Sequence, residues 1–104
     1  MANYNVSGLL TLAELAKTKK PLWYVYILKC ADNTYYTGIT NNIEKRIACH
    51  ENGHGAKYTK GRGPFKLVFQ ESHPDRSLAS QREIQIKKFS LTQKKELIEL
   101  PELL

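Results

Sequence analysis

The chain has 104 residues, 41% of them hydrophobic and 25% charged, which suits one domain with a single core and excludes wholesale disorder or collagen-like repetition. No stretch approaches the ~18 consecutive apolar residues of a membrane-spanning helix, so we expect no membrane partner. A net charge of +6, from 16 Lys and Arg against 10 Asp and Glu, favours a nucleic-acid partner about as strongly as a basic domain without one.

The cysteine pattern and the first residues indicate a reducing compartment. Cys30 and Cys49 form no C-x-x-C pair, which argues against a disulfide scaffold. A zinc site built from these cysteines with His50 and His54 is conceivable but matches no standard ligand spacing. Residues 1–8 lack the basic segment of a secretory signal, so we expect a cytoplasmic protein.

The chain divides into an N-terminal extension, one compact domain and a short tail. Residues 1–21 form the extension, in which Thr11 and Glu14 have capping-box spacing and Leu12, Leu15 and Ala16 recur at helical intervals. We therefore expect a short helix there. The domain is predicted to span residues 22–100, and residues 101–104 form the tail.

Three segments are predicted to be strands. Residues 23–28 are a dense run of aromatic and β-branched residues that is apolar on both faces, which predicts a strand buried on both sides. Asp32-Asn33 supplies turn chemistry, so residues 35–40 should form the returning strand of a hairpin. A third strand is expected over residues 66–72.

Three helices are expected to accompany these strands. Asn41 or Asn42 can cap a helix over residues 43–51, which Asn52-Gly53 should end. Residues 77–89 and 92–100 are predicted to form the second and third helices. The expected fold is therefore an α/β domain with a three-stranded antiparallel sheet flanked by helices.

Six residues with possible roles in chemistry follow one another on the predicted strands and helices: Tyr26, Tyr36, Gly38, Arg46, His50 and Glu83. This order resembles the GIY-YIG nuclease family, and residues 56–64 resemble its small stand-alone, single-domain branch. The name-giving triplets depart from the family pattern, because Tyr24-Val25 replaces Gly-Ile and Thr37 stands where isoleucine is usual. The resemblance covers about residues 22–98.

The resemblance implies a metal-dependent endonuclease that hydrolyses nucleic-acid phosphodiester bonds. We expect DNA as the substrate, structure-selective rather than sequence-specific cutting, a 3′-hydroxyl and a 5′-phosphate as products, and a place in DNA repair. The resemblance also implies that Glu83 holds one Mg²⁺ or Mn²⁺ and that Arg46 neutralises the scissile phosphate. Tyr36 is the implied general base, with Tyr26 orienting it or sharing the role. His50 relays a proton or binds the phosphate backbone.

Each of these residues also has an ordinary structural interpretation. Strand tyrosines are commonly packing aromatics, and His50 could be a cation favoured at a helix C-terminus. Glu83 has capping-box spacing from Ser80. A non-catalytic nucleic-acid-binding module on the same fold is therefore the alternative function, and a protein-interaction scaffold is a third.

A basic, glycine-rich loop follows the first predicted helix at residues 53–64. Its Lys57, Lys60 and Arg62 could contact nucleic-acid phosphates, and Tyr58 could stack on a base. The alternative is a flexible connector.

The two motif tyrosines can serve one site only if they lie on the same face of the sheet. In an antiparallel pair, opposed residues share a face and the faces alternate along each strand. Pairing Tyr26 with Gly38 meets this condition for Tyr36 and leaves room for the Tyr26 ring. The hairpin loop should then hold an odd number of residues centred on Asp32, with Asn33 left-handed or a bulge present.

Overall fold

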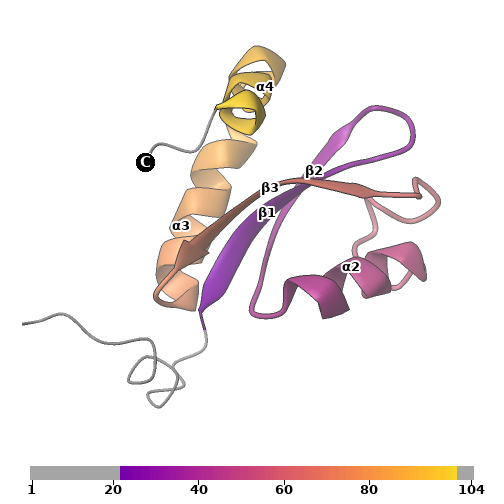
Figure 1. Cartoon of the computed structure of the whole chain (residues 1–104), viewed down its shortest axis with the longest axis horizontal. Coiled ribbons are helices and arrows are strands. Elements are labelled where there is room, and N and C mark those ends of the chain that lie inside the picture. The colour runs from indigo at the N-terminus through magenta and orange to yellow at the C-terminus, as the bar shows by residue number, and fades with distance from the viewer. Residues whose placement is uncertain (1–21, 101–104) are drawn as a thin grey trace, which may run out of the picture.

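The computed structural model describes residues 22–100, which form one antiparallel sheet with three helices (Figure 1). The elements follow in the order β1 (Trp23–Lys29), β2 (Tyr35–Thr40), α2 (Ile43–Glu51), β3 (Lys66–His73), α3 (Arg76–Lys87) and α4 (Leu91–Glu99). The strand order is β2-β1-β3, so β1 is central and β2 and β3 are edges. This confirms the predicted fold class. The helix expected in residues 1–21 and the tail at 101–104 lie outside the described residues.

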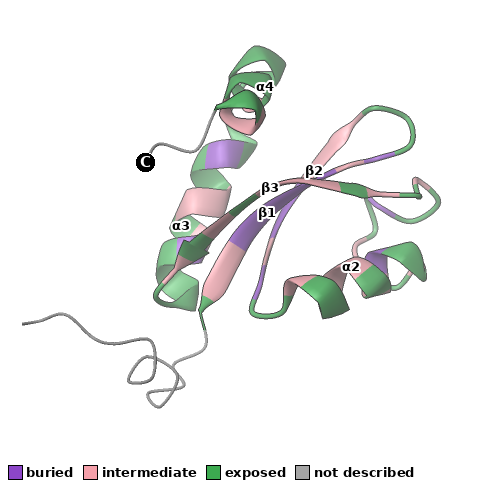
Figure 2. Ribbon diagram, viewed as in Figure 1, coloured by how far each residue is buried: buried purple, intermediate pink, exposed green. Residues whose placement is uncertain are grey.

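The central strand β1 is buried on both faces, as its composition predicts (Figure 2). Val25 and Ile27 point toward α3 and form the apolar core with Ala79 and Ile86. Tyr26 alternates with them and faces α2 instead, because successive strand side chains point to opposite faces. The sheet thus separates an apolar face from a face that carries polar side chains.

The β1–β2 hairpin has the predicted register. Tyr26 pairs with Gly38, and the last pair, between Lys29 and Tyr35, leaves the five residues 30–34 in the loop. Asn33 has a φ of 67°, which is the left-handed conformation that this loop requires. A Cβ on Gly38 would lie 2.6 Å from Tyr26 Oη, so glycine at this position makes room for the tyrosine.

Side-chain caps determine where the three helices begin. Asn42 caps α2 by accepting a hydrogen bond from the Lys45 amide at 3.0 Å. Asp75 caps α3, and Ser90 caps α4 in a capping box with Gln93. The second and third helices therefore start at Arg76 and Leu91, one residue earlier than predicted. Ser80 lies inside α3, so the capping-box interpretation of Glu83 is wrong. Within residues 22–100, none of the helices is long and apolar enough to cross a membrane.

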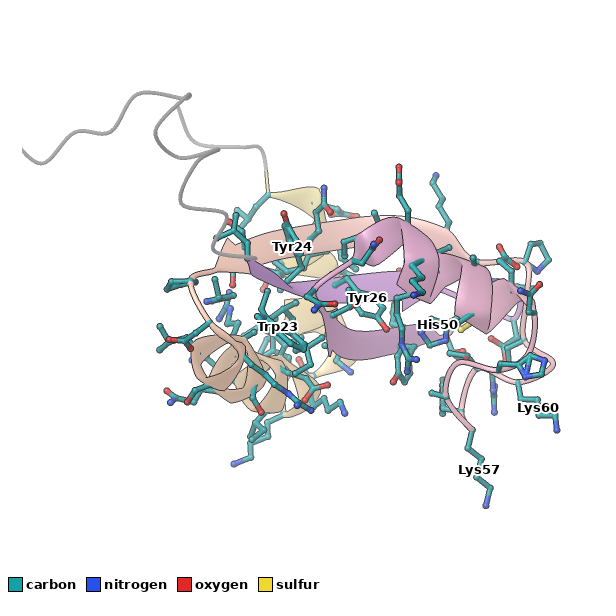
Figure 3. All side chains as sticks on the ribbon, turned by 90° about the horizontal axis from the view of Figure 1, so that it is seen from below. Trp23, Tyr24, Tyr26, His50, Lys57 and Lys60 are labelled. Carbon is teal, nitrogen blue, oxygen red and sulfur yellow. The ribbon has the colours of Figure 1, made fainter. Side chains whose placement is uncertain are left out.

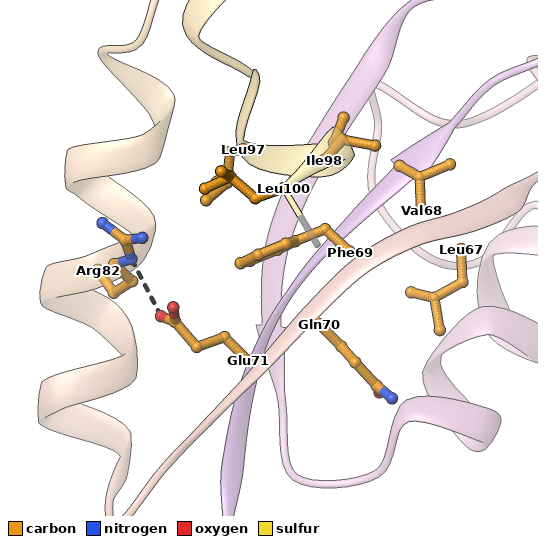
Figure 4. Close-up of a pocket in the computed structure, with 9 residues that line it drawn as sticks. All are labelled: Leu67, Val68, Phe69, Gln70, Glu71, Arg82, Leu97, Ile98 and Leu100. Atoms are coloured by element: carbon orange, nitrogen blue, oxygen red, sulfur yellow. Dashed lines mark hydrogen bonds and ion pairs between the residues drawn. The ribbon is translucent and has the colours of Figure 1, made fainter. Parts of the chain in front are cut away.

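A pocket of about 570 Å³ lies between β3 and the helices α3 and α4 (Figure 4). Apolar side chains from β3 and α4 line most of it, including Phe69 and Leu97. Its polar end holds an ion pair between Arg82 Nε and Glu71 Oε1 at 3.0 Å. His73 Nε2 lies 2.8 Å from the same carboxylate oxygen. None of these groups belongs to the predicted site.

Candidate active site

Tyr26 of β1 and Tyr36 of β2 come together with His50 of α2 on the polar face of the sheet. The ring centroids lie 6.3 Å apart for the two tyrosines, 6.0 Å for Tyr26 and His50, and 5.1 Å for Tyr36 and His50. Figure 3 shows Tyr26 and His50 beside each other where β1 passes α2. We call these three residues together with Arg46 the tyrosine cluster. The hairpin register and the helix that follows it therefore assemble residues separated by up to 24 positions.

Tyr26 is the buried member of the cluster. Its side chain is 1% exposed, and Oη lies 2.8 Å from His50 Nε2. Burial raises the pKa of Tyr26 to about 12, although the Arg46 guanidinium acts in the opposite direction. Tyr26 therefore keeps its proton at neutral pH.

Arg46 is held as a cation beside both tyrosines. Its interactions with the hydroxyls of Tyr26 and Tyr36 raise its pKa, and burial opposes this only in part. His50 shows the reverse behaviour, because burial and then the Arg46 charge lower the pKa of the imidazole. At neutral pH the cluster thus combines a fixed guanidinium cation with a neutral imidazole.

The hydrogen bonds around His50 favour one tautomer. Thr59 Oγ1 donates its own proton to the Ala56 carbonyl at 3.0 Å and so accepts from His50 Nδ1, while the buried Tyr26 hydroxyl needs an acceptor of its own. His50 Nε2 provides that acceptor at 2.8 Å. The ring proton then lies on Nδ1 and is donated to Thr59 Oγ1 at 2.7 Å. His50 is therefore a neutral base whose orientation is fixed from both sides.

Stability should fall as the solution is acidified through the His50 titration. An unfolded histidine has a pKa of about 6.5, so below that pH the unfolded chain binds a proton that folded His50 resists. The free energy of unfolding then falls by up to ~1.4 kcal/mol per pH unit. The fall ends when the pH reaches the lowered pKa of folded His50. We expect thermal unfolding between about pH 7.5 and pH 5 to show this loss in wild type and in the exposed His54→Gln control, and to show less of it in His50→Gln. An identical pH profile for His50→Gln would contradict the pKa assignment.

The loop between α2 and β3 is folded onto the tyrosine cluster. Thr59 is 1% exposed and contacts His50, and Tyr58 stacks on Tyr36 with 6.0 Å between ring centroids. Gly55 lies against the His50 ring, where a Cβ would stand 2.2 Å from Nδ1. The loop is therefore a wall of the site and not a free connector.

The four loop residues predicted to bind nucleic acid divide into two kinds. Lys57 and Lys60 are exposed and project away from the loop (Figure 3). Arg62 forms an ion pair with Asp32 in the hairpin loop, and its guanidinium lies 4.4 Å from the centroid of the Tyr58 ring. Of these four residues, only the two lysines are free, within residues 22–100, of contacts that compete with phosphate binding.

Glu83 lies on α3, which packs against both β2 and β1. Its side chain is 18% exposed, and Oε2 lies 3.5 Å from the Nζ of Lys87 one helical turn later. The Glu83 charge contributes to the raised pKa of Tyr26. Among the described residues the carboxylate makes no hydrogen bond to the tyrosine cluster, and its charge acts weakly on Tyr26.

The model of the family described as the GIY-YIG catalytic domain matches residues 22–96. The chain belongs to the GIY-YIG family. A UPF0213 protein of Clostridium perfringens is 59% identical over 75 residues, 72% of this chain and 81% of the relative. A UPF0213 protein of Staphylococcus haemolyticus is 57% identical over 76 residues, 73% and 93% of the two chains. The solution NMR structure of a protein from E. faecalis has a TM-score of 0.52 at 35% identity, covering 72% of this chain and 80% of that one.

Membership in the GIY-YIG family confirms the resemblance drawn from the ordered tyrosines, arginine, histidine and glutamate. GIY-YIG domains are nuclease domains, so the family indicates phosphodiester chemistry on a nucleic acid. The two departures in the triplets are compatible with the fold: Tyr24-Val25 continues β1, and Thr37 occupies a buried position in β2.

A divalent cation of the kind used by GIY-YIG nucleases fits the residues at this site. Within the described part of the chain, no three His, Cys, Asp or Glu side chains converge into a metal cluster. The cysteines and histidines do not make the zinc site considered from the sequence, because both ring nitrogens of His50 are hydrogen-bonded. Mg²⁺ commonly takes one or two carboxylates and completes its shell with water and substrate phosphate. Glu83 on α3 is a partly buried carboxylate of the kind that such an ion would need.

Gly55 and Thr59 belong to the site but do not stand out in the sequence. A Gly55→Ala variant should lose about 1–3 kcal/mol of stability, because the added methyl group meets the His50 ring. Thermal unfolding of the single and double variants tests this. In a His50→Ala background the same change should cost little, since the clashing ring is gone. Equal losses in both backgrounds would show that Gly55 acts through its backbone instead.

Proposed function

We propose that this chain is a metal-dependent endonuclease that hydrolyses phosphodiester bonds of DNA and selects the structure of its substrate. The observation that carries the proposal is the cluster of Tyr26, Tyr36, Arg46 and His50 on one face of the sheet, in a chain of the GIY-YIG family. Phosphodiester hydrolysis requires an activated water and stabilisation of negative charge on the phosphate. The cluster contains groups suited to both tasks.

The different surroundings of the two tyrosines support different roles for them. Tyr26 is buried, stays protonated and is bonded to His50, so we assign it to holding His50 and Arg46 in position. Tyr36 is less buried and borders an open pocket, so we assign it to the attacking water. Neutral His50 already accepts from Tyr26 and donates to Thr59, so we assign it to holding Tyr26 in place beside Tyr36.

Arg46 and Glu83 supply the charges that the reaction requires. The planar guanidinium presents donors in a fork that matches two phosphate oxygens, and the neighbouring tyrosines keep it charged. Glu83 is the residue that would hold Mg²⁺ or Mn²⁺. When bound there, the ion supplies Lewis-acid stabilisation of charge on the phosphate.

Selection of structure follows from the small recognition surface of the domain. Residues 22–100 form one domain, and its exposed loop lysines contact phosphates rather than base edges. Phosphate contacts carry no sequence information, whereas junctions and flaps differ in shape. The proposal is therefore cutting at a DNA structure, as expected in DNA repair.

A nucleic-acid-binding module without turnover is the alternative function. The basic loop and the positive charge of the chain would serve a binder equally well. Glu83 favours catalysis over binding alone, because a carboxylate weakens the binding of a polyanion, whereas a metal-dependent reaction needs one.

Binding should depend on the two free loop lysines. We expect Lys57→Ala/Lys60→Ala to bind every DNA sequence more weakly and to lower the slope of log K against log salt by about two, close to one for each lost contact with duplex DNA. Arg62→Ala should change this slope less, because Asp32 already neutralises Arg62. Titrations at several salt concentrations measure the slopes, and unchanged slopes for the double variant would remove the loop from the interface.

Incubation of the full-length chain with flapped, branched, duplex and single-stranded DNA and with matched RNA tests the proposed function. Mg²⁺ or Mn²⁺ is added to one set of reactions and a chelator to the other. We expect metal-dependent cuts in flapped or branched DNA, with little cleavage of plain duplex. Binding without cleavage of any substrate would support the alternative.

A further inference from the structure

A second pocket of about 360 Å³ lies beside Tyr36, around the open edge of β2. It lies within the range of ~300–1,000 Å³ that is common for ligand sites. We call it the basic pocket, and its lining residues are Tyr35, Tyr36, Thr37, Tyr58, Lys87 and Lys94. The proposed hydrolysis gives no role to Thr37, Lys87 or Lys94, although they adjoin the residue assigned to the attacking water.

The basic pocket carries more positive charge than its surroundings neutralise. Lys87, at the end of α3, is paired with Glu83 at 3.5 Å, and its side chain is 52% exposed. Lys94 comes from α4 and takes part in no ion pair within residues 22–100. The other ionisable groups of the lining are tyrosines, which carry no positive charge. The pocket is thus suited to an anion.

The lining of the basic pocket also contains an unpartnered hydroxyl group. Thr37 is 4% exposed, and its Oγ1 has no hydrogen-bond partner among the described residues. An unsatisfied buried hydroxyl destabilises a fold by about 1–3 kcal/mol. A ligand oxygen that reaches this hydroxyl would supply the missing acceptor.

We propose that the basic pocket binds the phosphate next to the scissile phosphate on the same strand. This rests on the proposed function, because the scissile phosphate is the one assigned to Arg46. Successive phosphates of one strand of a duplex are ~3.4 Å apart along the helix axis, so a strand at Tyr36 brings a second phosphate to the neighbouring side chains. Lys94, which is not paired within residues 22–100, supplies the main counter-charge, and Lys87 adds a cation that Glu83 already balances. The Thr37 hydroxyl donates a hydrogen bond.

The decisive comparison is Lys94→Gln against Lys95→Gln in the full-length chain. Both variants lose one charge on α4, but Lys95 does not line the basic pocket. Binding to a single-stranded oligonucleotide is measured in a chelator, so that no cleavage occurs. We expect Lys94→Gln to lower the salt slope by about 0.7 and Lys95→Gln to leave it unchanged. Equal slopes for the two variants would overturn the proposal.

Replacing single phosphates by uncharged methylphosphonates locates the contact. One methylphosphonate position should abolish the difference in oligonucleotide affinity between wild type and Arg46→Gln. At the neighbouring position, a methylphosphonate should abolish the difference between wild type and Lys94→Gln. If no position removes the Lys94 effect, the pocket is wrong even when the protein cuts DNA. If this coupling is found in a protein that cuts nothing, the pocket stands and the nuclease function fails.

Thr37→Val gives a second readout with opposite signs for stability and binding. The change removes a hydroxyl that has no partner in the free protein, so thermal stability should stay the same or rise. Oligonucleotide affinity should fall several-fold, because the donor to the phosphate is lost. An affinity equal to that of wild type would exclude the hydroxyl from the pocket's function.

Discussion

Glu83→Gln should reduce cleavage by about a thousandfold or more, because losing the metal's carboxylate removes several kcal/mol of charge stabilisation from the transition state. Affinity for DNA should stay the same or increase, since the variant removes a negative charge close to the phosphate site. Single-turnover cleavage at saturating protein, together with a binding titration in chelator, separates the two effects.

Glu96→Gln is the matched control for Glu83→Gln. Glu96 lies on α4, is exposed, and forms no ion pair within residues 22–100, so the same charge change there should leave the cleavage rate unaltered. If Glu83→Gln cuts as fast as this control, the metal assignment is wrong. If both variants lose activity equally, the effect of Glu83 reflects net charge.

Tyr36→Phe should slow cleavage by about 10²–10⁴-fold, the usual contribution of a positioned general base. The ring is retained, so its contacts with His50 and Tyr58 should keep the cluster folded. Binding should therefore change little, and the loss should appear in the single-turnover rate constant rather than in the affinity.

Tyr24→Phe tests whether the loss is specific to Tyr36. Tyr24 lies two residues before Tyr26 on the same strand and pairs with Thr40, outside the tyrosine cluster. Its hydroxyl should be dispensable for cleavage. A Tyr36→Phe variant that is as active as Tyr24→Phe would remove Tyr36 from the reaction and leave only a packing role for it.

The hairpin register was predictable because the side-chain alternation of a strand is fixed. Requiring Tyr26 and Tyr36 to share a face left few pairings, and the structure has the expected pair with Asn33 left-handed. The helix over Ile43–Glu51 was equally predictable, since its capping asparagine and its terminal Asn-Gly are local sequence signals. Arg46 and His50 then follow at helical spacing on one face.

The second layer of the site was not predictable from local patterns. Thr59 meets His50 across a loop, and Arg62 meets Asp32 across 30 positions. No periodicity governs such contacts, because they depend on the path of the loop over the sheet. Arg62 therefore looked like a free phosphate ligand in the sequence, whereas the structure gives it a carboxylate partner.

The surroundings of Glu83 and Lys87 near the end of α3 were likewise not predictable from local sequence patterns. Capping-box spacing offered a local explanation for Glu83, but Asp75 caps the helix and places Glu83 in its interior. Lys87 and Lys94 belong to different helices, and they meet in one pocket only through the way α3 and α4 fold onto the sheet. Sequence spacing within either helix does not indicate that meeting.

The most direct test of the account starts from a preformed complex of the full-length chain with flapped DNA in chelator. Excess Mg²⁺ or Mn²⁺ is then added, and the amount and the chemical ends of the product are followed over a single turnover. The account predicts that cutting begins only after the metal is added and leaves 3′-hydroxyl and 5′-phosphate ends. A complex that forms but yields no product with either ion, or a product with other ends, would contradict it.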